Sequence, residues 1–192
     1  MKGEKLSNEL TDNIEQKINE LGIEHINNSG VILTETDLQC LVYKKLLEID
    51  ILGTLTDTQD GYKTYPVHTE LSWYDQNGKL KLKPDITILI PQYLKLTSQR
   101  NINLPNKGFI FSEGGIIFEL KFNRFKKTTA FIKSITSDIE KINELQRIHP
   151  NTFCYFIWFS KYNINDEEIN ALVSNQNLNK YKIIYINGNI NT

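Results

Sequence analysis

Two short segments of this 192-residue chain place charged side chains beside strongly apolar runs. Asp85 opens the run 86–90, and Glu119 and Lys121 follow the run 116–118, with one residue between them. Side chains alternate along a β-strand, so Glu119 and Lys121 should share one face of a strand. If Asp85 lies beside them in the folded protein, two carboxylates and one ammonium group converge.

That combination suits the hydrolysis of a phosphodiester. Hard cations such as Mg²⁺ prefer carboxylate oxygens, with water and substrate phosphate completing the coordination. The cation can lower the pKa of a bound water and offset the charge on the phosphate oxygens. A neighbouring lysine can orient or activate the attacking water, and it adds positive charge at the transition state.

A simpler interpretation is that Asp85 and Glu119 form surface ion pairs with Lys121 and Lys83, which are common and weak. Three large apolar residues precede Glu119. They favour a partly buried position for Glu119 and Lys121, where a charge needs a partner or a purpose.

Apolar periodicity and turn signals predict an ordered series of elements. They are a helix at 7–21 that ends at Gly22, a helix at 34–48, a loop at 53–66, a strand at 67–74, a turn at 75–78, a strand at about 80–90, an irregular segment at 91–107, a strand at 116–122, a helix at about 128–148, a strand at 152–159, a helix at 166–174 and a strand at 181–186. Thr34 and Asp37 form a pair that resembles a capping box at the start of the second helix.

This order predicts an α/β (α+β) fold in which helices flank a central mixed sheet. The strand–helix–strand unit from 116 to 159 should form a right-handed crossover. We expect one domain over 1–192, with a helical appendage at 1–33, a core at 34–160 and a C-terminal helix and strand at 161–192. The helix at 7–21 is then a candidate for packing in a homodimer.

The pair of segments Pro84-Asp85 and Glu119-Leu120-Lys121 resembles the bipartite motif of the PD-(D/E)xK nuclease superfamily. Restriction endonucleases, Holliday junction resolvases and many repair and defence nucleases belong to it. The resemblance covers roughly residues 34–160 and implies the restriction endonuclease-like αβββαβ core. By this resemblance, Asp85, Glu119 and the backbone carbonyl of Leu120 would bind Mg²⁺ or Mn²⁺, and Lys121 would be the catalytic lysine.

Two further acids match positions of the family. Glu35, at the start of the second predicted helix, is similar to the acidic residue that many members carry near the metal. Its alternative role is to complement the helix macrodipole. Glu70 is similar to an acidic position of some subfamilies, or else is a solvent-facing strand residue. Gln39 lies one turn after Glu35 and could hydrogen-bond substrate or the ligand carboxylates.

Basic side chains cluster around the two motif segments. Lys83 belongs to a predicted basic strand face, and Arg124, Lys126 and Lys127 follow Lys121 closely. Such a cluster is usually a solvated surface, but beside a phosphate site it suits contacts to a nucleic-acid backbone. Two aromatic residues between these charges, Phe122 and Phe125, could stack on bases, whereas the helical register of Phe131 favours core packing. Asp138 and Lys141 are expected to be surface positions.

The whole chain sets wider limits. Its net charge of −1 and pI of about 6.3 give no global basic field, which argues against a protein that coats nucleic acid without specificity. The two cysteines lack zinc-ligand spacing and are expected as reduced, packed thiols. With no apolar leader and no run of 18 apolar residues, we expect a cytoplasmic protein without a membrane span.

These observations lead to one main functional hypothesis. We expect a metal-dependent nuclease that acts on DNA in restriction, defence or repair. The alternatives are an inactive module on the same fold that binds nucleic acid or a protein, and an RNA-cleaving effector.

Overall fold

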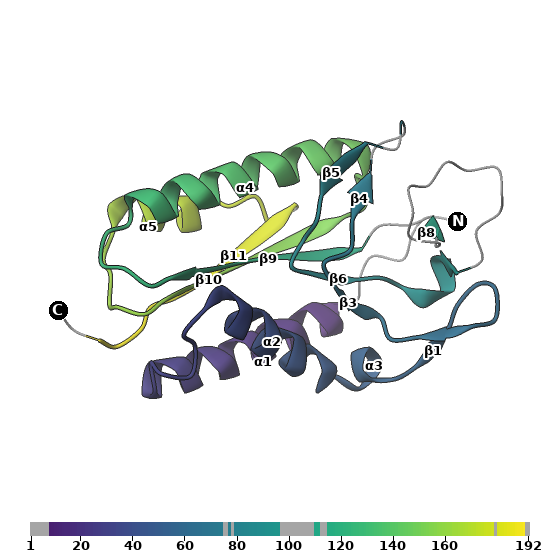
Figure 1. Ribbon diagram of the computed structural model, residues 1–192, viewed down its shortest axis with the longest axis horizontal. Coiled ribbons are helices and arrows are strands. Elements are labelled where there is room, and N and C mark those ends of the chain that lie inside the picture. Colours follow the sequence, from purple (N-terminus) through teal and green to yellow (C-terminus); the bar gives the residue numbers. More distant parts are fainter. Residues whose placement is uncertain are drawn as a thin grey trace.

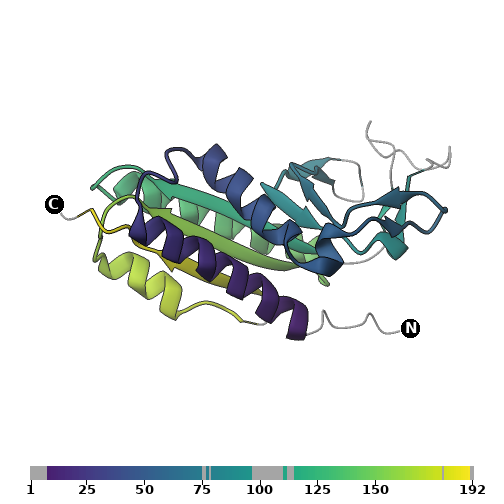
Figure 2. The same ribbon diagram turned by 90° about the horizontal axis from the view of Figure 1, so that it is seen from below.

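The computed structural model describes residues 8–74, 77, 79–96, 110–111, 115–178 and 180–190. Helices cover both faces of a central sheet, which confirms the mixed α/β prediction (Figure 1). The helices α1 (Asn8–Asn27) and α2 (Glu35–Leu47) lie side by side on one face (Figure 2). The helices α4 (Thr129–Ile148) and α5 (Glu167–Ser174) lie on the other face.

The central sheet has five strands in the order β11-β10-β9-β6-β3. Their bounds are β3 Val67–Thr69, β6 Ile86–Ile88, β9 Ile116–Asn123, β10 Phe153–Ser160 and β11 Tyr181–Ile186. The strands β9, β10 and β11 are parallel, whereas β6 runs antiparallel to both β9 and β3. Helix α4 connects β9 to the parallel strand β10, as the sequence predicted.

The alternation of side chains along β9 divides the core into two layers. Phe118 and Leu120 pack in the layer formed with α1 and α2. Ile117 packs in the layer formed with α4. Residues 119 and 121 have the same parity as Ile117, so Glu119 and Lys121 lie on the α4 face of the sheet.

The predicted hairpin over 67–90 is present, but both of its strands are interrupted. Glu70 has a φ of 52° and leaves the extended conformation after β3. Pro84 has no N–H for a ladder and separates the two halves of the second strand. The hairpin therefore pairs β3 with β6 at one end, and β4 (Trp73–Tyr74) with β5 (Leu80–Leu82) at the other.

Shorter elements complete the described part of the chain. They are α3 Asp50–Gly53, β1 Thr56–Asp57, β2 Lys63–Thr64, the 3-10 helix Pro91–Tyr93, β7 Leu94–Lys95 and β8 Ile110–Phe111. The segment predicted as a loop at 53–66 thus holds the small β1–β2 hairpin. Within the predicted turn at 75–78 only Asn77 is described, and 97–109 lie outside the described residues.

Helix α1 differs from its prediction in length and in packing. It continues past Gly22 to Asn27, because Gly22 serves close packing and does not end the helix. A Cβ at Gly22 would lie 2.9 Å from Ile186 Cδ1 of β11. The apolar residues Ile14 and Ile18 are fully buried in the core. The buried face of α1 thus packs into the hydrophobic core and is not free for a dimer contact, so the homodimer stays a prediction.

Other local predictions have mixed outcomes. The capping box of Thr34 and Asp37 at the start of α2 is confirmed. Cys154 is buried, whereas Cys40 is exposed, so the expectation of two packed thiols is wrong for Cys40. In the part of the chain that the structure describes, no helix has the length and apolar character needed to cross a membrane.

Candidate functional site

Asp85 and Glu119 meet across the antiparallel pair β6–β9. The register pairs Ile86 with Phe118, so one further step places Asp85 opposite Glu119. Side chains at directly opposite positions of antiparallel strands lie on the same face. The neighbouring carboxylate of Asp85 also contributes to raising the pKa of Glu119. The structure therefore brings together the two acids that lie 34 positions apart in the sequence.

Two hydrogen bonds hold Asp85 in place. Its Oδ2 accepts the backbone N–H of Leu120 at 2.7 Å, which ties the carboxylate to β9. Its backbone carbonyl accepts Gln39 Nε2 at 2.8 Å, which ties the residue to α2. Gln39, expected to hydrogen-bond substrate or the ligand carboxylates, thus lies at the site, where its amide bonds the backbone of Asp85. Burial raises the pKa of the Asp85 carboxyl, although the Leu120 N–H and the Lys121 charge oppose that shift.

Glu119 is the most deeply buried carboxylate of this group. Only 6% of the residue is exposed, and its Oε1 has no hydrogen-bond partner. Burial, followed by repulsion from Asp85 and Asp138, raises the pKa of Glu119 to about 8. A buried acceptor without a partner costs free energy that a bound cation could recover.

Lys121 lies between carboxylates from two helices. Its Nζ is 3.3 Å from Glu35 Oε1 of α2 and 3.2 Å from Asp138 Oδ2 of α4. It also donates to the backbone carbonyl of Leu120 at 3.2 Å. Burial alone would lower the pKa of Lys121, but the surrounding carboxylates outweigh burial and raise it. Lys121 is therefore a fixed ammonium group at neutral pH, suited to donate hydrogen bonds and positive charge.

Asp138 belongs to the site, and its prediction as a surface residue is wrong. The residue is 7% exposed. Its Oδ1 accepts Lys141 Nζ at 2.8 Å, and its Oδ2 forms the ion pair with Lys121. A sequence signal for this burial exists, because Asp138 follows Ile135 by three residues and precedes Ile142 by four. That spacing places it on the buried stripe of α4.

Replacing Asp138 with alanine should lower the free energy of unfolding by about 1–3 kcal/mol. The change leaves Lys121 half-buried with one carboxylate fewer and opens space beneath α4. Urea unfolding at pH 7 measures this decrease in the free energy of unfolding. Glu140→Ala, an exposed acid on the same helix, should stay within about 0.5 kcal/mol of the unmodified protein. Equal stabilities for the two variants would contradict a supporting role for Asp138.

Glu35 reaches the site from the first turn of α2. Its carboxylate contacts Lys121 and accepts the backbone N–H of Phe122 at 3.4 Å. The side chain is 46% exposed, so Glu35 lies at the open side of the cluster. It is close enough to β9 to act at the site, and its position in the first helical turn also complements the macrodipole.

Glu70 does not join the other carboxylates. The register places it opposite Asp85, and its backbone N–H donates to the Asp85 carbonyl at 3.1 Å. Its positive φ turns the chain out of the strand, and its carboxylate pairs with Lys83 in an exposed ion pair. Lys83, predicted to contact nucleic acid, is thus engaged with Glu70.

The other predicted nucleic-acid contacts lie just beyond the site. Arg124, Lys126 and Lys127 are exposed in the loop that joins β9 to α4. Phe125 in the same loop is exposed, whereas Phe131 is buried against Trp158 as expected. Phe122 is also buried, which removes it as a stacking surface.

The charges of the cluster favour a divalent cation. Four acids (Asp85, Glu119, Glu35 and Asp138) face two lysines (Lys121 and Lys141), an excess of two negative charges once the proton that Glu119 holds up to about pH 8 is displaced. Among the described residues, no three His, Cys, Asp or Glu side chains form a complete metal site. Mg²⁺ does not need one, because it commonly binds one or two carboxylates, water and substrate phosphate. The donor set at Asp85 and Glu119, with an unpartnered Oε1, fits that mode.

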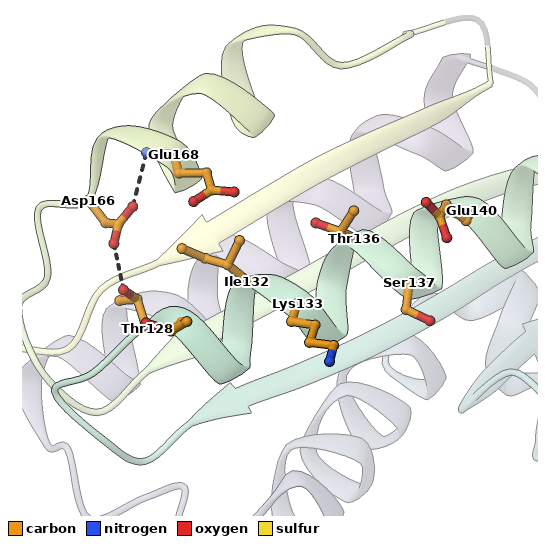
Figure 3. A pocket seen from close by; sticks show the side chains of 9 residues that line it. Thr128, Ile132, Lys133, Thr136, Ser137, Glu140, Asp166 and Glu168 are labelled. Atoms are coloured by element: carbon orange, nitrogen blue, oxygen red, sulfur yellow. Dashed lines mark hydrogen bonds between the residues drawn. The ribbon is translucent and has the colours of Figure 1, made fainter.

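A separate groove of about 700 Å³ runs along α4 toward α5 (Figure 3). Hydroxyl groups and three acids line it together with Ile132 and Lys133, and Asp166 accepts a hydrogen bond from Thr128 at its end. None of its lining residues belongs to the Asp85–Glu119 cluster. With Glu140, Asp166 and Glu168 in its wall, the groove suits a phosphate chain poorly, so we place the candidate site at the sheet. Neither a family model, nor a curated protein, nor a solved structure matches this chain.

Proposed function

We propose that this protein is a metal-dependent nuclease of the PD-(D/E)xK type that hydrolyses phosphodiester bonds, with DNA as the main substrate. One observation carries the proposal. Asp85 and Glu119 face each other on adjacent strands, next to the ammonium group of Lys121, and one Glu119 oxygen is buried without a partner.

The order of the elements supports the same proposal. Helix α2 precedes the antiparallel strands β3, β6 and β9, and α4 then leads to β10 beside β9. With the short strands outside the central sheet set aside, this order agrees with the αβββαβ core that the resemblance of the two motif segments implies. The acids and the lysine fall on the second and third strands of that series, where the family carries its motif.

The residues present define how a metal would be held. Asp85, Glu119 and the carbonyl of Leu120 would hold Mg²⁺ or Mn²⁺, since a carbonyl oxygen has two lone pairs and can share its contact with Lys121. When bound, the cation supplies charge that stabilises the scissile phosphate and lowers the pKa of water.

Lys121 contributes as a cation and not as a base. The surrounding carboxylates keep it protonated, so it can donate hydrogen bonds to the phosphate or to the attacking water. Glu35 and Asp138 hold its side chain from opposite sides of the sheet. Fixing the ammonium group before substrate binds avoids the cost of reorganisation during the reaction.

Divalent-cation binding tests the proposal. We expect Mn²⁺ and Mg²⁺ to bind the unmodified protein in isothermal titration calorimetry, and Asp85→Ala to weaken binding at least about 100-fold. Asp57→Ala is the matched control, because the Asp57 side chain is 71% exposed and belongs to the β1–β2 hairpin, outside the central sheet that carries the site. A protein that keeps the fold as a binding module would bind no cation here, and that result would overturn the proposal.

A further inference from the structure

An aromatic and basic surface, exposed at residues 124–126 and half-buried at residues 161–162, adjoins the candidate site. It consists of Arg124, Phe125 and Lys126 from the β9–α4 loop, with Lys161 and Tyr162 from the β10–α5 loop. Phe125 is 67% exposed, the largest exposed fraction among the bulky apolar residues of the described chain. Both loops lie at the same end of the sheet (Figure 1). We call this set the aromatic–basic surface.

Asn123, the last residue of β9, fixes the two loops to each other. Its Oδ1 accepts the backbone N–H of Phe125 at 3.1 Å. Its backbone carbonyl accepts the N–H of Lys161 at 2.9 Å, which continues the β9–β10 ladder into the loops. The residue is 4% exposed. The surface is therefore built on a rigid strand end.

Cations lie near both rings of this surface. Arg124 Cζ is 5.9 Å from the centre of the Phe125 ring. Lys126 Nζ and Lys161 Nζ lie 5.6 and 5.9 Å from the centre of the Tyr162 ring. Rings that alternate with cations can stack on bases while the cations contact the phosphates of the same strand.

The charge of the surrounding sequence favours an anionic partner. Residues 120–137 contain five lysines and arginines and no acid, although the whole chain has a net charge of −1. Helix α4 begins there with no acid in its first turn and no side-chain cap, so its free N–H groups and dipole add to the positive field. Two acids of the α5 segment, Asp166 and Glu168, line the same groove as this helix start, and the carboxylate of Asp166 is engaged with Thr128 and the N-terminus of α5.

We infer that the aromatic–basic surface binds an unpaired segment of a nucleic-acid strand and directs that strand to the Asp85–Glu119 site. The inference rests on the proposed nuclease function and names its substrate class. Phe125 would stack on a base, which a duplex prevents because its bases are already stacked on one another. Arg124 lies three positions after Lys121, roughly 10 Å along an extended chain, so a single nucleic-acid strand could contact both residues.

Binding measured without cleavage tests the inference. We use fluorescence anisotropy with a labelled single-stranded 20-mer of thymidine, and with a 20-base-pair duplex, in EDTA. We expect the single strand to bind more tightly, and Phe125→Ala to weaken its binding about tenfold. The double variant Arg124→Ala with Lys126→Ala should reduce the slope of log affinity against log salt by about 1.4, because each phosphate contact to a single strand contributes roughly 0.7.

Two exposed residues of the β1–β2 region provide matched controls. Tyr62 is 51% exposed and Lys63 lies beside it, so Tyr62→Ala and Lys63→Ala should leave strand binding unchanged. If the protein binds the single strand tightly through Phe125 but cleaves no substrate, the result would support strand binding by this surface and contradict the proposed nuclease function. Cleavage that depends on Lys121 but not on Phe125 would support the nuclease function and contradict the role of this surface. Equal affinity for the duplex, or no binding of the single strand, would overturn the inference.

Discussion

Lys121→Ala should lower the rate of phosphodiester hydrolysis by about 10³-fold. The ammonium group of Lys121 is the only side-chain cation in direct contact with both Glu35 and Asp138 among the described residues, and it lies beside the two proposed metal ligands. In the proposed mechanism, its loss removes positive charge beside the scissile phosphate. Metal binding should persist, because Asp85 and Glu119 remain.

The experiment compares single-turnover cleavage of single- and double-stranded DNA and RNA with Mg²⁺ or Mn²⁺. Lys141→Ala is the matched control, because Lys141 pairs with the same Asp138 but its side chain is 51% exposed. That variant should lose no more than a few-fold in rate. Cleavage that survives both Lys121→Ala and Asp85→Ala would place the chemistry elsewhere in the protein.

The centre of the site was accessible to sequence reasoning because it depends on strand alternation. The apolar run before Glu119 predicted a buried strand, and period-two alternation placed Glu119 and Lys121 on one face. The register that sets Asp85 opposite Glu119 depends on tertiary pairing across a separation of 34 positions, which local patterns do not encode. The two acids could be named from the sequence, but their meeting had to come from the structure.

Asp138 was missed because a charged residue on a helix is ordinarily solvated. Its position between Ile135 and Ile142 on the buried stripe was the available signal. Glu70 is the opposite case: the resemblance matched it to a further acidic position, with a solvent-facing strand residue as the alternative, and the structure places its carboxylate in an exposed pair with Lys83. A single residue with positive φ turns its side chain to Lys83, and no alternation rule predicts such a break.

The fold was predictable where elements are long and periodic. The strand Tyr181–Ile186 and the helices α2 and α4 agree with their predicted bounds within one residue at each end. The end of α1 was wrong because Gly22 was interpreted by its helix propensity, whereas its contact with Ile186 decides its role. Close packing between distant segments is a tertiary effect that outweighs propensity.

Glu119→Gln should stabilise the metal-free protein at alkaline pH. In the folded protein burial raises the pKa of Glu119 from its ordinary 4.5 to about 8. The folded state therefore holds a proton that the unfolded state has released, throughout the window between these two values. Stability falls as the pH rises through that window, since the unfolded state binds fewer protons there. Above pH 8 the buried charge of Glu119 lowers the free energy of unfolding by its full amount. That amount is about 5 kcal/mol as an upper bound and about 2–3 kcal/mol after structural relaxation.

Urea unfolding in EDTA at pH 5.5 and pH 8.5 measures this cost for the unmodified protein and for Glu119→Gln. The free energy of unfolding of Glu119→Gln should exceed that of the unmodified protein by an amount that grows with pH. Glu167→Gln, an exposed change in α5, should have the same pH dependence as the unmodified protein. Added Mn²⁺ should restore stability at pH 8.5 only where Glu119 is present, because the cation replaces the missing partner of its Oε1. If the free energies of unfolding of the unmodified protein and of Glu119→Gln vary with pH in the same way, Glu119 is solvated or already paired. The main structural reason for a cation at this position would then be lost.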